Sequence, residues 1–144
     1  MSYRFGRPLL AAAIMLAALP AMAQTAQTPQ NYPAKTVLST GQTILGEPIQ
    51  YPAGMAKVTA AEVTIAPGGE TLLHQHGVPM MVYILDGEVS VDYGDKGVRV
   101  FKTGDAFVEA MSTHKGMNKT AKPVRILAIY MGSDSGTNVV PQGK

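Results

Sequence analysis

The sequence contains no cysteine, which excludes several kinds of stabilisation and chemistry. Disulfide bonds, thiol catalysis, iron–sulfur clusters held by thiolates and the usual cysteine zinc sites all need that residue. The chain has 144 residues, of which 46% are hydrophobic and 15% are charged. This composition still provides enough apolar material for one packed domain.

Long apolar stretches are also scarce, and the one that exists lies near the start of the sequence. Two arginines precede an apolar run over Leu9–Leu19, and Ala21-Met22-Ala23 forms a small-residue cleavage site. This arrangement predicts a secretory signal peptide over residues 1–23, cleaved after Ala23. We therefore expect a periplasmic or secreted protein that keeps no membrane anchor, because the apolar run is short for a bilayer.

An excess of one charge sign is missing once that segment is set aside. Residues 1–23 hold two of the 12 Lys and Arg residues and none of the 10 Asp and Glu residues, so residues 24–144 are formally neutral. Because nucleic-acid binding needs a basic patch, we expect no nucleic-acid partner. The expected partner is a small-molecule ligand or substrate.

Helical periodicity is hard to find after residue 35, and short β-rich segments separated by turn residues take its place. Residues 24–35 predict a linker or N-terminal arm, residues 36–131 one antiparallel β-sandwich or barrel, and residues 132–144 an irregular tail. Asp86-Gly87 predicts a tight hairpin turn. The expected strands are residues 57–66, 71–76, 80–85, 88–93, 98–102, 106–110 and 124–131.

The chain has three histidines, and their positions predict a metal site. His74 and His76 lie in one expected strand, where alternate residues share a face and are about 7 Å apart. His114 follows the expected strand 106–110, and a sheet that curls on itself can bring it to the other two. Because imidazoles are common ligands of transition metals, we predict that these three residues bind one divalent ion.

Glycines around the histidines complete a pattern that resembles the two sequence motifs of the cupin superfamily. The first set is Gly68, His74, His76 and Gly87, and the second is Gly104, His114 and Asn118. The phrases His-Gln-His-Gly-Val-Pro-Met and Gly-Asp-Ala-Phe-Val-Glu-Ala are similar to those of small secreted bacterial cupins. The resemblance implies an all-β fold, the antiparallel double-stranded β-helix or jelly-roll barrel, with a metal in its pocket.

Two departures from the cupin pattern affect the expected site. The pattern has a glutamate as a fourth ligand where this chain has Met80, and it has one more residue before the histidine of the second motif. Within a strand, a slip of one residue would turn His114 to the opposite face. In a loop, the missing residue would be absorbed, and both outcomes stay open from sequence.

Four side chains are candidates for a fourth ligand or for support of the histidines: Met80, Glu70, Glu109 and Asn118. A thioether from Met80 would favour copper, although methionine is most often a packing residue. Glu70 and Glu109 are expected as solvated rim residues or as substitutes for the missing glutamate. Asn118 is expected to hydrogen-bond a histidine or to cap a turn. Imidazole donors alone do not choose among Fe, Mn, Ni, Zn and Cu.

These features favour a metal-binding cupin, with two further interpretations open. If the protein is an enzyme, we expect a dioxygenase-like oxidoreductase or an isomerase that acts on a small organic molecule. The alternatives are a non-catalytic module that binds copper or a small ligand, and an assembly protein whose barrel has lost its metal. The fold alone does not decide, because this kind of barrel hosts many chemistries.

The sequence also predicts a homodimer. A small domain without disulfides gains stability by association, and the segment Met80–Leu85 is apolar on both faces. Packing through Val37–Tyr51 would cover the outer face of the sheet. The competing interpretation is a monomer whose Val37–Tyr51 segment folds over its own sheet.

Overall fold

The computed structural model describes residues 32–143, and the compact unit considered below begins at Lys35. The expected signal peptide and most of the expected linker over residues 24–35 lie outside the described residues. In the part of the chain that the structure describes, no helix has the length and hydropathy to cross a bilayer.

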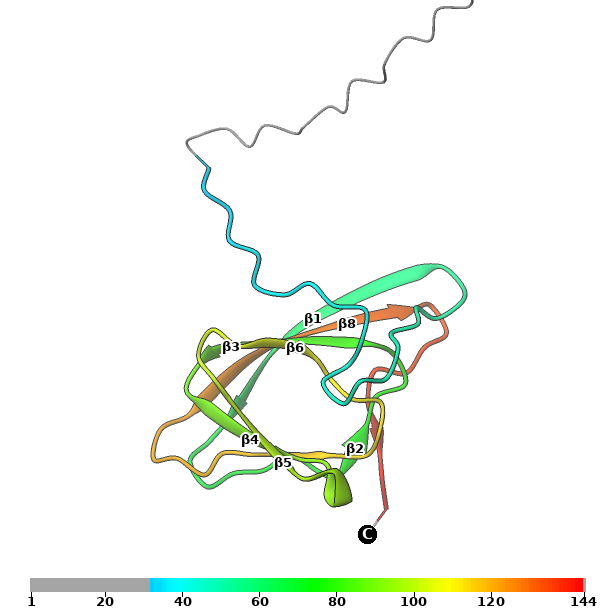
Figure 1. Ribbon diagram of the computed structural model, residues 1–144. Helices are drawn as coiled ribbons and strands as arrows, with labels where there is room; N and C mark the ends of the chain where they lie inside the picture. The colour runs from blue at the N-terminus through cyan, green and yellow to red at the C-terminus, as the bar shows by residue number, and fades with distance from the viewer. Residues whose placement is uncertain (1–31, 144) are drawn as a thin grey trace, which may run out of the picture. The chain divides into compact units, whose positions relative to one another are not determined.

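Nine antiparallel strands and one short 3₁₀ helix make up the described elements, which confirms the predicted all-β class. Figure 1 shows the larger sheets facing each other as the two walls of a barrel. The four-stranded sheet has the order β1 (Ala56–Ile65), β8 (Val124–Ser133), β3 (Met80–Asp86), β6 (Ala106–Val108). The three-stranded sheet has the order β5 (Val98–Lys102), β4 (Glu88–Asp92), β7 (Lys115–Met117). A separate pair is formed by β2 (His74–Gln75) and β9 (Val140–Pro141). The 3₁₀ helix η1 (Gly94–Lys96) joins β4 to β5.

The predicted hairpin at Asp86-Gly87 is wrong, because β3 and β4 lie in different sheets. Gly87 instead forms the corner at which the chain leaves one sheet for the other. Its φ of +86° is a left-handed value, and a Cβ there would lie 2.9 Å from the carbonyl oxygen of Pro123. Asp86-Gly87 has the right composition for a hairpin turn. The inward-facing residues of β3 and β4, however, are buried against each other only when the two strands lie in separate sheets.

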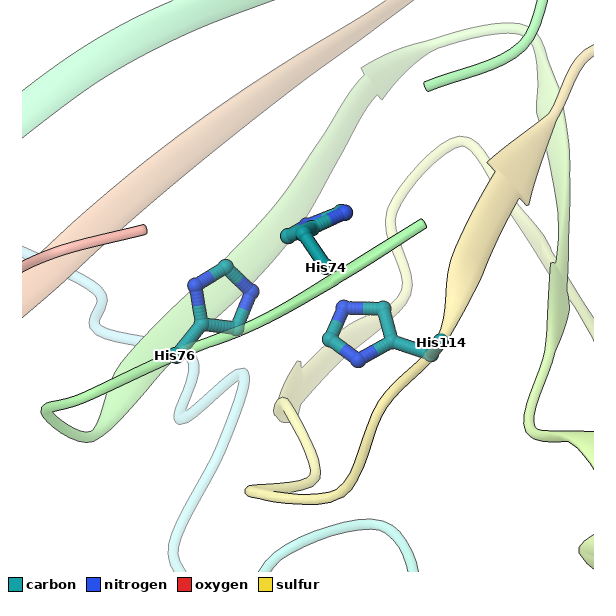
Figure 2. Close-up of side chains that lie close together, drawn as sticks. All are labelled: His74, His76 and His114. Atoms are coloured by element: carbon teal, nitrogen blue, oxygen red, sulfur yellow. The ribbon is translucent and has the colours of Figure 1, made fainter. Parts of the chain in front are cut away.

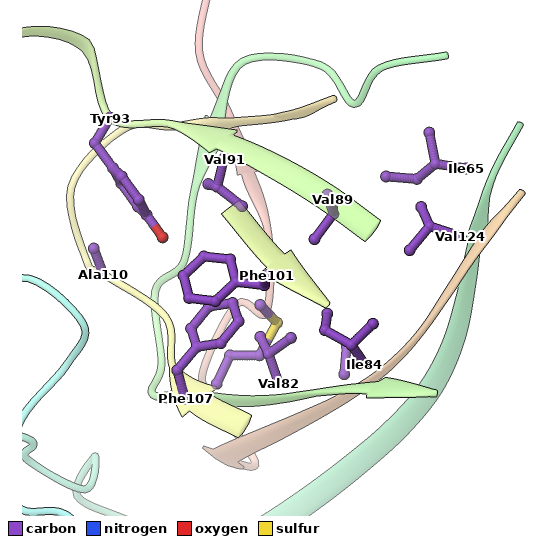
Figure 3. Packing of buried hydrophobic residues seen from close by; sticks show 12 residues of the cluster. Ile65, Val82, Ile84, Val89, Val91, Tyr93, Phe101, Phe107, Ala110 and Val124 are labelled. Carbon is purple, nitrogen blue, oxygen red and sulfur yellow. The ribbon is translucent and has the colours of Figure 1, made fainter. Parts of the chain in front are cut away.

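The core fills the space between the two sheets with branched aliphatic residues and an aromatic pair (Figure 3). The rings of Phe101 and Phe107 stack with centroids 3.8 Å apart and planes 16° apart, and they link β5 to β6. Ile84, Val89 and Val124 are almost completely buried. The alternation of side chains therefore brings one face of β1, β3, β4, β5, β6 and β8 to a shared interior.

The segment that precedes β1 packs partly on the domain's own barrel. The backbone N–H of Ile44 donates to the carbonyl of Val108, and the side chains of Ile44 and Leu45 contact the core. Glu47 accepts hydrogen bonds from the hydroxyl of Thr43 and from the N–H of Met111. Residues 43–47 thus pack on the barrel of their own chain, as the monomer interpretation of this segment expects.

The C-terminal segment, expected to be irregular, contains a strand. Residues Val140–Pro141 form β9 against β2, and the N–H of Gln142 donates to the carbonyl of Leu73. The backbone of β2 has His114 on one side, so its other edge is free to pair with β9. Residues 132–138, which precede this two-residue strand, are rich in Gly, Ser and Asn, and this composition is typical of an irregular tail. The sequence therefore does not predict the strand.

Candidate metal centre

Backbone pairing between two distant segments brings the three histidines together. The N–H of His114 donates to the carbonyl of His74 at 2.8 Å, and the N–H of His74 donates back at 3.1 Å. His76 follows β2 on the same side as His74. The ring centroid of His74 lies 4.5 Å from that of His114, and the ring of His76 lies 5.0 Å from each of the other two. Figure 2 shows the rings turned toward a common point.

His114 points inward despite the residue that is missing before it. The chain over residues 111–113 bends without forming a strand, and β7 begins only at Lys115. That bend absorbs the one-residue difference, so the imidazole is only 2% exposed. A slip inside a strand would have turned the side chain to the other face.

A backbone carbonyl fixes the proton of each imidazole. The Nδ1 atoms of His74, His76 and His114 lie 2.7, 3.0 and 2.8 Å from the carbonyl oxygens of Leu72, Asn138 and Ser112. A carbonyl oxygen only accepts, so each Nδ1 must carry the hydrogen. In the neutral ring, each Nε2 then keeps a free lone pair, which is the form that binds a metal.

The three imidazole rings lie close enough to share one ion. One ring nitrogen from each histidine lies within 4.8 Å of the others. Nε2 of His76 is buried and has no hydrogen-bond partner among the described residues. A buried acceptor without a partner is costly, and a bound cation would satisfy it. The cluster can therefore hold a metal ion.

Burial keeps the three imidazoles neutral. It lowers the pKa of His76 to about 4, opposed by the hydrogen bond to Asn138 and helped by the neighbouring rings of His114 and His74. Burial also lowers the pKa values of His74 and His114. Near neutral pH the rings are therefore deprotonated and available as ligands, because the charged form is disfavoured away from water.

Glu109 is buried beside the histidines, which corrects the expectation that it is a solvated rim residue. It is 4% exposed, and its Oε1 accepts hydrogen bonds from the hydroxyl of Tyr93 at 2.7 Å and from the N–H of Ala110 at 2.8 Å. Its Oε2 lies 3.7 Å from Nε2 of His114. Burial raises the pKa of this carboxyl group, opposed by those two hydrogen bonds.

The other three candidates have different surroundings. Glu70 is on the rim and pairs with Lys115 at 2.9 Å, outside the cavity that the histidines line. Met80 is buried and lines that cavity. Asn118 caps a turn: its amide donates to the carbonyls of Ile65 and Lys122, and its oxygen accepts from Thr120. The structure shows no hydrogen bond between Asn118 and a histidine of the described chain.

The histidines open into a cavity of about 290 Å³ whose remaining lining is mostly apolar. Side chains from both sheets contribute, among them Val63, Val82, Val91, Phe107, Ile126 and Ala128. The ring of Tyr130 also lines it, 5.7 Å from the ring of His76. Tyr93, the partner of Glu109, is not among the site residues predicted from sequence, although its shared parity with Val89 and Val91 indicates an inward position.

Comparison with known proteins supports the architecture. Residues 61–130 match the family model described as the Cupin domain. These residues include all three histidines and Glu109. No curated protein matches the sequence.

Several solved structures share the fold at low sequence identity. The polyketide cyclase RemF from Streptomyces resistomycificus has a TM-score of 0.53 and 16% identity, over 84% of this chain and 87% of its own. The oxalate decarboxylase of Lactobacillus farciminis has a TM-score of 0.51 and 23% identity, over 58% of this chain and 26% of its own. The DMSP lyase DddQ from Ruegeria pomeroyi has a TM-score of 0.51 and 23% identity, over 60% of this chain and 45% of its own. The chain thus spans less than half the length of the decarboxylase and the lyase.

Proposed function

Because the family match and the barrel support a place in the cupin superfamily, we propose that this protein is a metal-dependent enzyme acting on a small organic molecule. His74, His76 and His114 bind one divalent transition metal, and the adjoining cavity holds the substrate. One observation carries the proposal: three imidazoles, each with Nδ1 hydrogen-bonded to a backbone carbonyl, meet at the wall of an apolar cavity.

The donor set fits a catalytic metal better than a structural one. Structural zinc sites are closed by four protein ligands, whereas three imidazoles leave coordination positions for water or substrate. Bound there, a metal such as Fe, Mn, Ni, Zn or Cu supplies a Lewis acid or a redox centre. The carbonyls of Leu72, Asn138 and Ser112 orient the rings, and burial keeps them unprotonated.

The cavity favours a substrate with an apolar body. Its walls are aliphatic and aromatic side chains, while its polar groups lie on the histidine side. Leu72 and Val139 line it while remaining 76% and 40% exposed, so its entrance is apolar as well. A ligand there would bury carbon against the walls and direct its oxygen atoms toward the metal. Oxidation of the dioxygenase type, or isomerisation, suits such an arrangement.

A non-catalytic copper-binding role is the second candidate, favoured by one observation. Met80 lines the same cavity as the histidines. A thioether beside three imidazoles suits copper, and copper handling suits an extracytoplasmic protein. The signal peptide that the sequence predicts over residues 1–23 supports that location for either role.

Metal analysis and an activity assay test the proposal together. The protein is isolated from the periplasm or medium of its producing cells, and its metal content is measured beside that of a His76→Ala variant. Bound iron, manganese, nickel or zinc in the wild type, lost in the variant, with turnover of a small apolar oxygenated compound, supports the enzyme. Copper without turnover supports the second role, and equal metal in both proteins contradicts both.

We also propose that two copies associate. Residues 43–47 are used inside the domain, but Tyr51, Met55 and Val58 stay 74%, 76% and 68% exposed around the start of β1. β1 is an edge strand of its sheet, so its backbone also has one open side. A second copy packed on this surface would cover both the apolar side chains and the strand edge.

A further inference from the structure

Among the described residues, Glu109 is the one acidic side chain that lines the cavity with the histidines. It directly follows β6 and has the same parity as Phe107, which lines the same cavity. A carboxylate in an apolar interior is costly unless it is paired. The two oxygens of Glu109 have very different surroundings.

The first oxygen is fully occupied. Oε1 accepts from the hydroxyl of Tyr93 at 2.7 Å and from the N–H of Ala110 at 2.8 Å, and these two donors fix the rotation of the carboxylate. Oε2 is thereby turned toward His114, and no hydrogen bond from the described residues reaches it. Tyr93 acts here as a positioning residue.

The second oxygen faces another acceptor. Nδ1 of His114 donates to Ser112, so in the neutral ring Nε2 carries a lone pair, and it lies 3.7 Å from Oε2 of Glu109. Two buried acceptors at this distance repel each other unless a proton or a metal ion lies between them. The buried Nε2 of His76, which has no partner among the described residues, belongs to the same cluster.

We infer that Glu109 supplies the carboxylate ligand that the first cupin motif lacks at Met80. The inference rests on the proposed function, since it assumes that the histidines bind a metal. Two ligand atoms about 2.1 Å from one tetrahedral or octahedral ion lie about 3.0 to 3.4 Å apart. The observed 3.7 Å between Oε2 of Glu109 and Nε2 of His114 exceeds this range by a few tenths of an ångström, so sharing an ion with the three histidines requires the carboxylate to move toward them.

A carboxylate at residue 109, in place of the motif glutamate at position 80, also lowers the electrostatic cost of holding the ion. Three neutral imidazoles leave a divalent ion with its full charge inside an apolar cavity, whereas one carboxylate halves that net charge. With four protein ligands, a six-coordinate ion such as Mn(II) still keeps two positions for water or substrate. A carboxylate from residue 109 approaches the cluster beside His114 instead of from β3. Position 80 then does not have to supply a ligand, and the side chain of Met80 is buried in the apolar wall of the cavity.

Glu109→Gln tests the inference, and Glu70→Gln is the matched control. Gln keeps the size of the side chain but removes the charge, and Glu70 is a rim carboxylate outside the cavity. Manganese is the probe, because carboxylate oxygen suits it, and its affinity is measured by isothermal titration calorimetry. We expect Glu109→Gln to weaken Mn(II) binding by at least about tenfold and Glu70→Gln to leave it unchanged.

A spectroscopic signature separates ligation from a purely structural role. The Cu(II) electron paramagnetic resonance spectrum of Glu109→Gln should show altered g and hyperfine values, because an oxygen donor is lost, while circular dichroism stays unchanged. Tyr93→Phe should weaken Mn(II) binding by less than Glu109→Gln. Equal affinity and an identical spectrum in Glu109→Gln would overturn the inference while leaving the three-histidine site intact. Failure of the wild type itself to bind metal would overturn the proposed function.

Discussion

His74 and His114 exchange both of their backbone hydrogen bonds, at 3.1 and 2.8 Å, and this pairing builds the candidate metal centre. The two residues come from segments separated by four strands, β3 to β6, so neither segment could position its imidazole alone. The pairing sets their ring centroids 4.5 Å apart, and His76 joins them from the end of β2. The histidine geometry is thus a property of the closed barrel.

The corner at Gly87 should be sensitive to a single methyl group. Gly87→Ala places a Cβ at positive φ and 2.9 Å from the carbonyl of Pro123, whereas Gly104→Ala meets the same kind of φ, +92°, with nothing within 4 Å. We expect the backbone conformation to destabilise both variants by about 1 kcal/mol or more. The contact with Pro123 should destabilise Gly87→Ala by about a further 1 kcal/mol. Urea denaturation measures both, and equal losses would contradict the account of the corner.

The metal-free protein should lose stability as the pH falls below about 6.5. The folded-state pKa of His76 is lowered to about 4, from the ordinary value of 6.5. Between these values the unfolded chain binds a proton that the folded chain does not, so stability rises with pH there and is lost as pH falls. The loss attributable to His76 is at most about 3 to 4 kcal/mol.

The raised pKa of Glu109 acts in the opposite direction, so the comparison must isolate His76. Urea denaturation of the wild type and of His76→Ala is measured from pH 7 down to pH 4, without metal. The stability of the wild type relative to the variant should decrease over this range. A constant difference would mean that burial does not depress the pKa of His76.

Filling the cavity should block ligand binding and spare the metal. Ala128 is 3% exposed and lines the cavity, so Ala128→Leu occupies space that an apolar ligand would use. We expect the affinity for 2-naphthol, followed by its fluorescence, to fall about tenfold or more, since the lost contact area is apolar. Val58→Leu, on the exposed side of β1, is the control and should bind the probe normally. Unchanged binding by Ala128→Leu would place the ligand elsewhere.

The proposed dimer should depend on the outer surface at the start of β1. The wild type is expected to show twice the mass of one chain by light scattering. Val58→Lys should shift it toward the monomer, because a charge replaces an apolar side chain in the contact. Val98→Lys changes a valine that is 50% exposed on β5 and serves as the control. A monomeric wild type, or a dimer insensitive to Val58→Lys, contradicts the proposed surface.

The sequence was sufficient for the features that depend on local alternation. The period-two pattern predicted most strands, and the spacing of His74 and His76 placed them on one side. Gly87 was misread because a left-handed glycine serves a hairpin and a sheet corner equally well. The inward position of His114 depends on a bend over residues 111–113 that leaves no mark in the composition. The sequence predicts Glu109 as a rim residue or a substitute ligand; its burial beside Tyr93, which follows β4 and donates to it, becomes visible only in the closed barrel.

The central claim is that His74, His76 and His114 bind one metal ion through Nε2. Crystals of the protein loaded with manganese or zinc, measured by anomalous diffraction at the absorption edge of that metal, test it most directly. We predict one peak in the barrel, about 2.1 Å from the three Nε2 atoms. A peak elsewhere, a peak bound to fewer than three of these atoms, or no peak in crystals grown with saturating metal would contradict the claim.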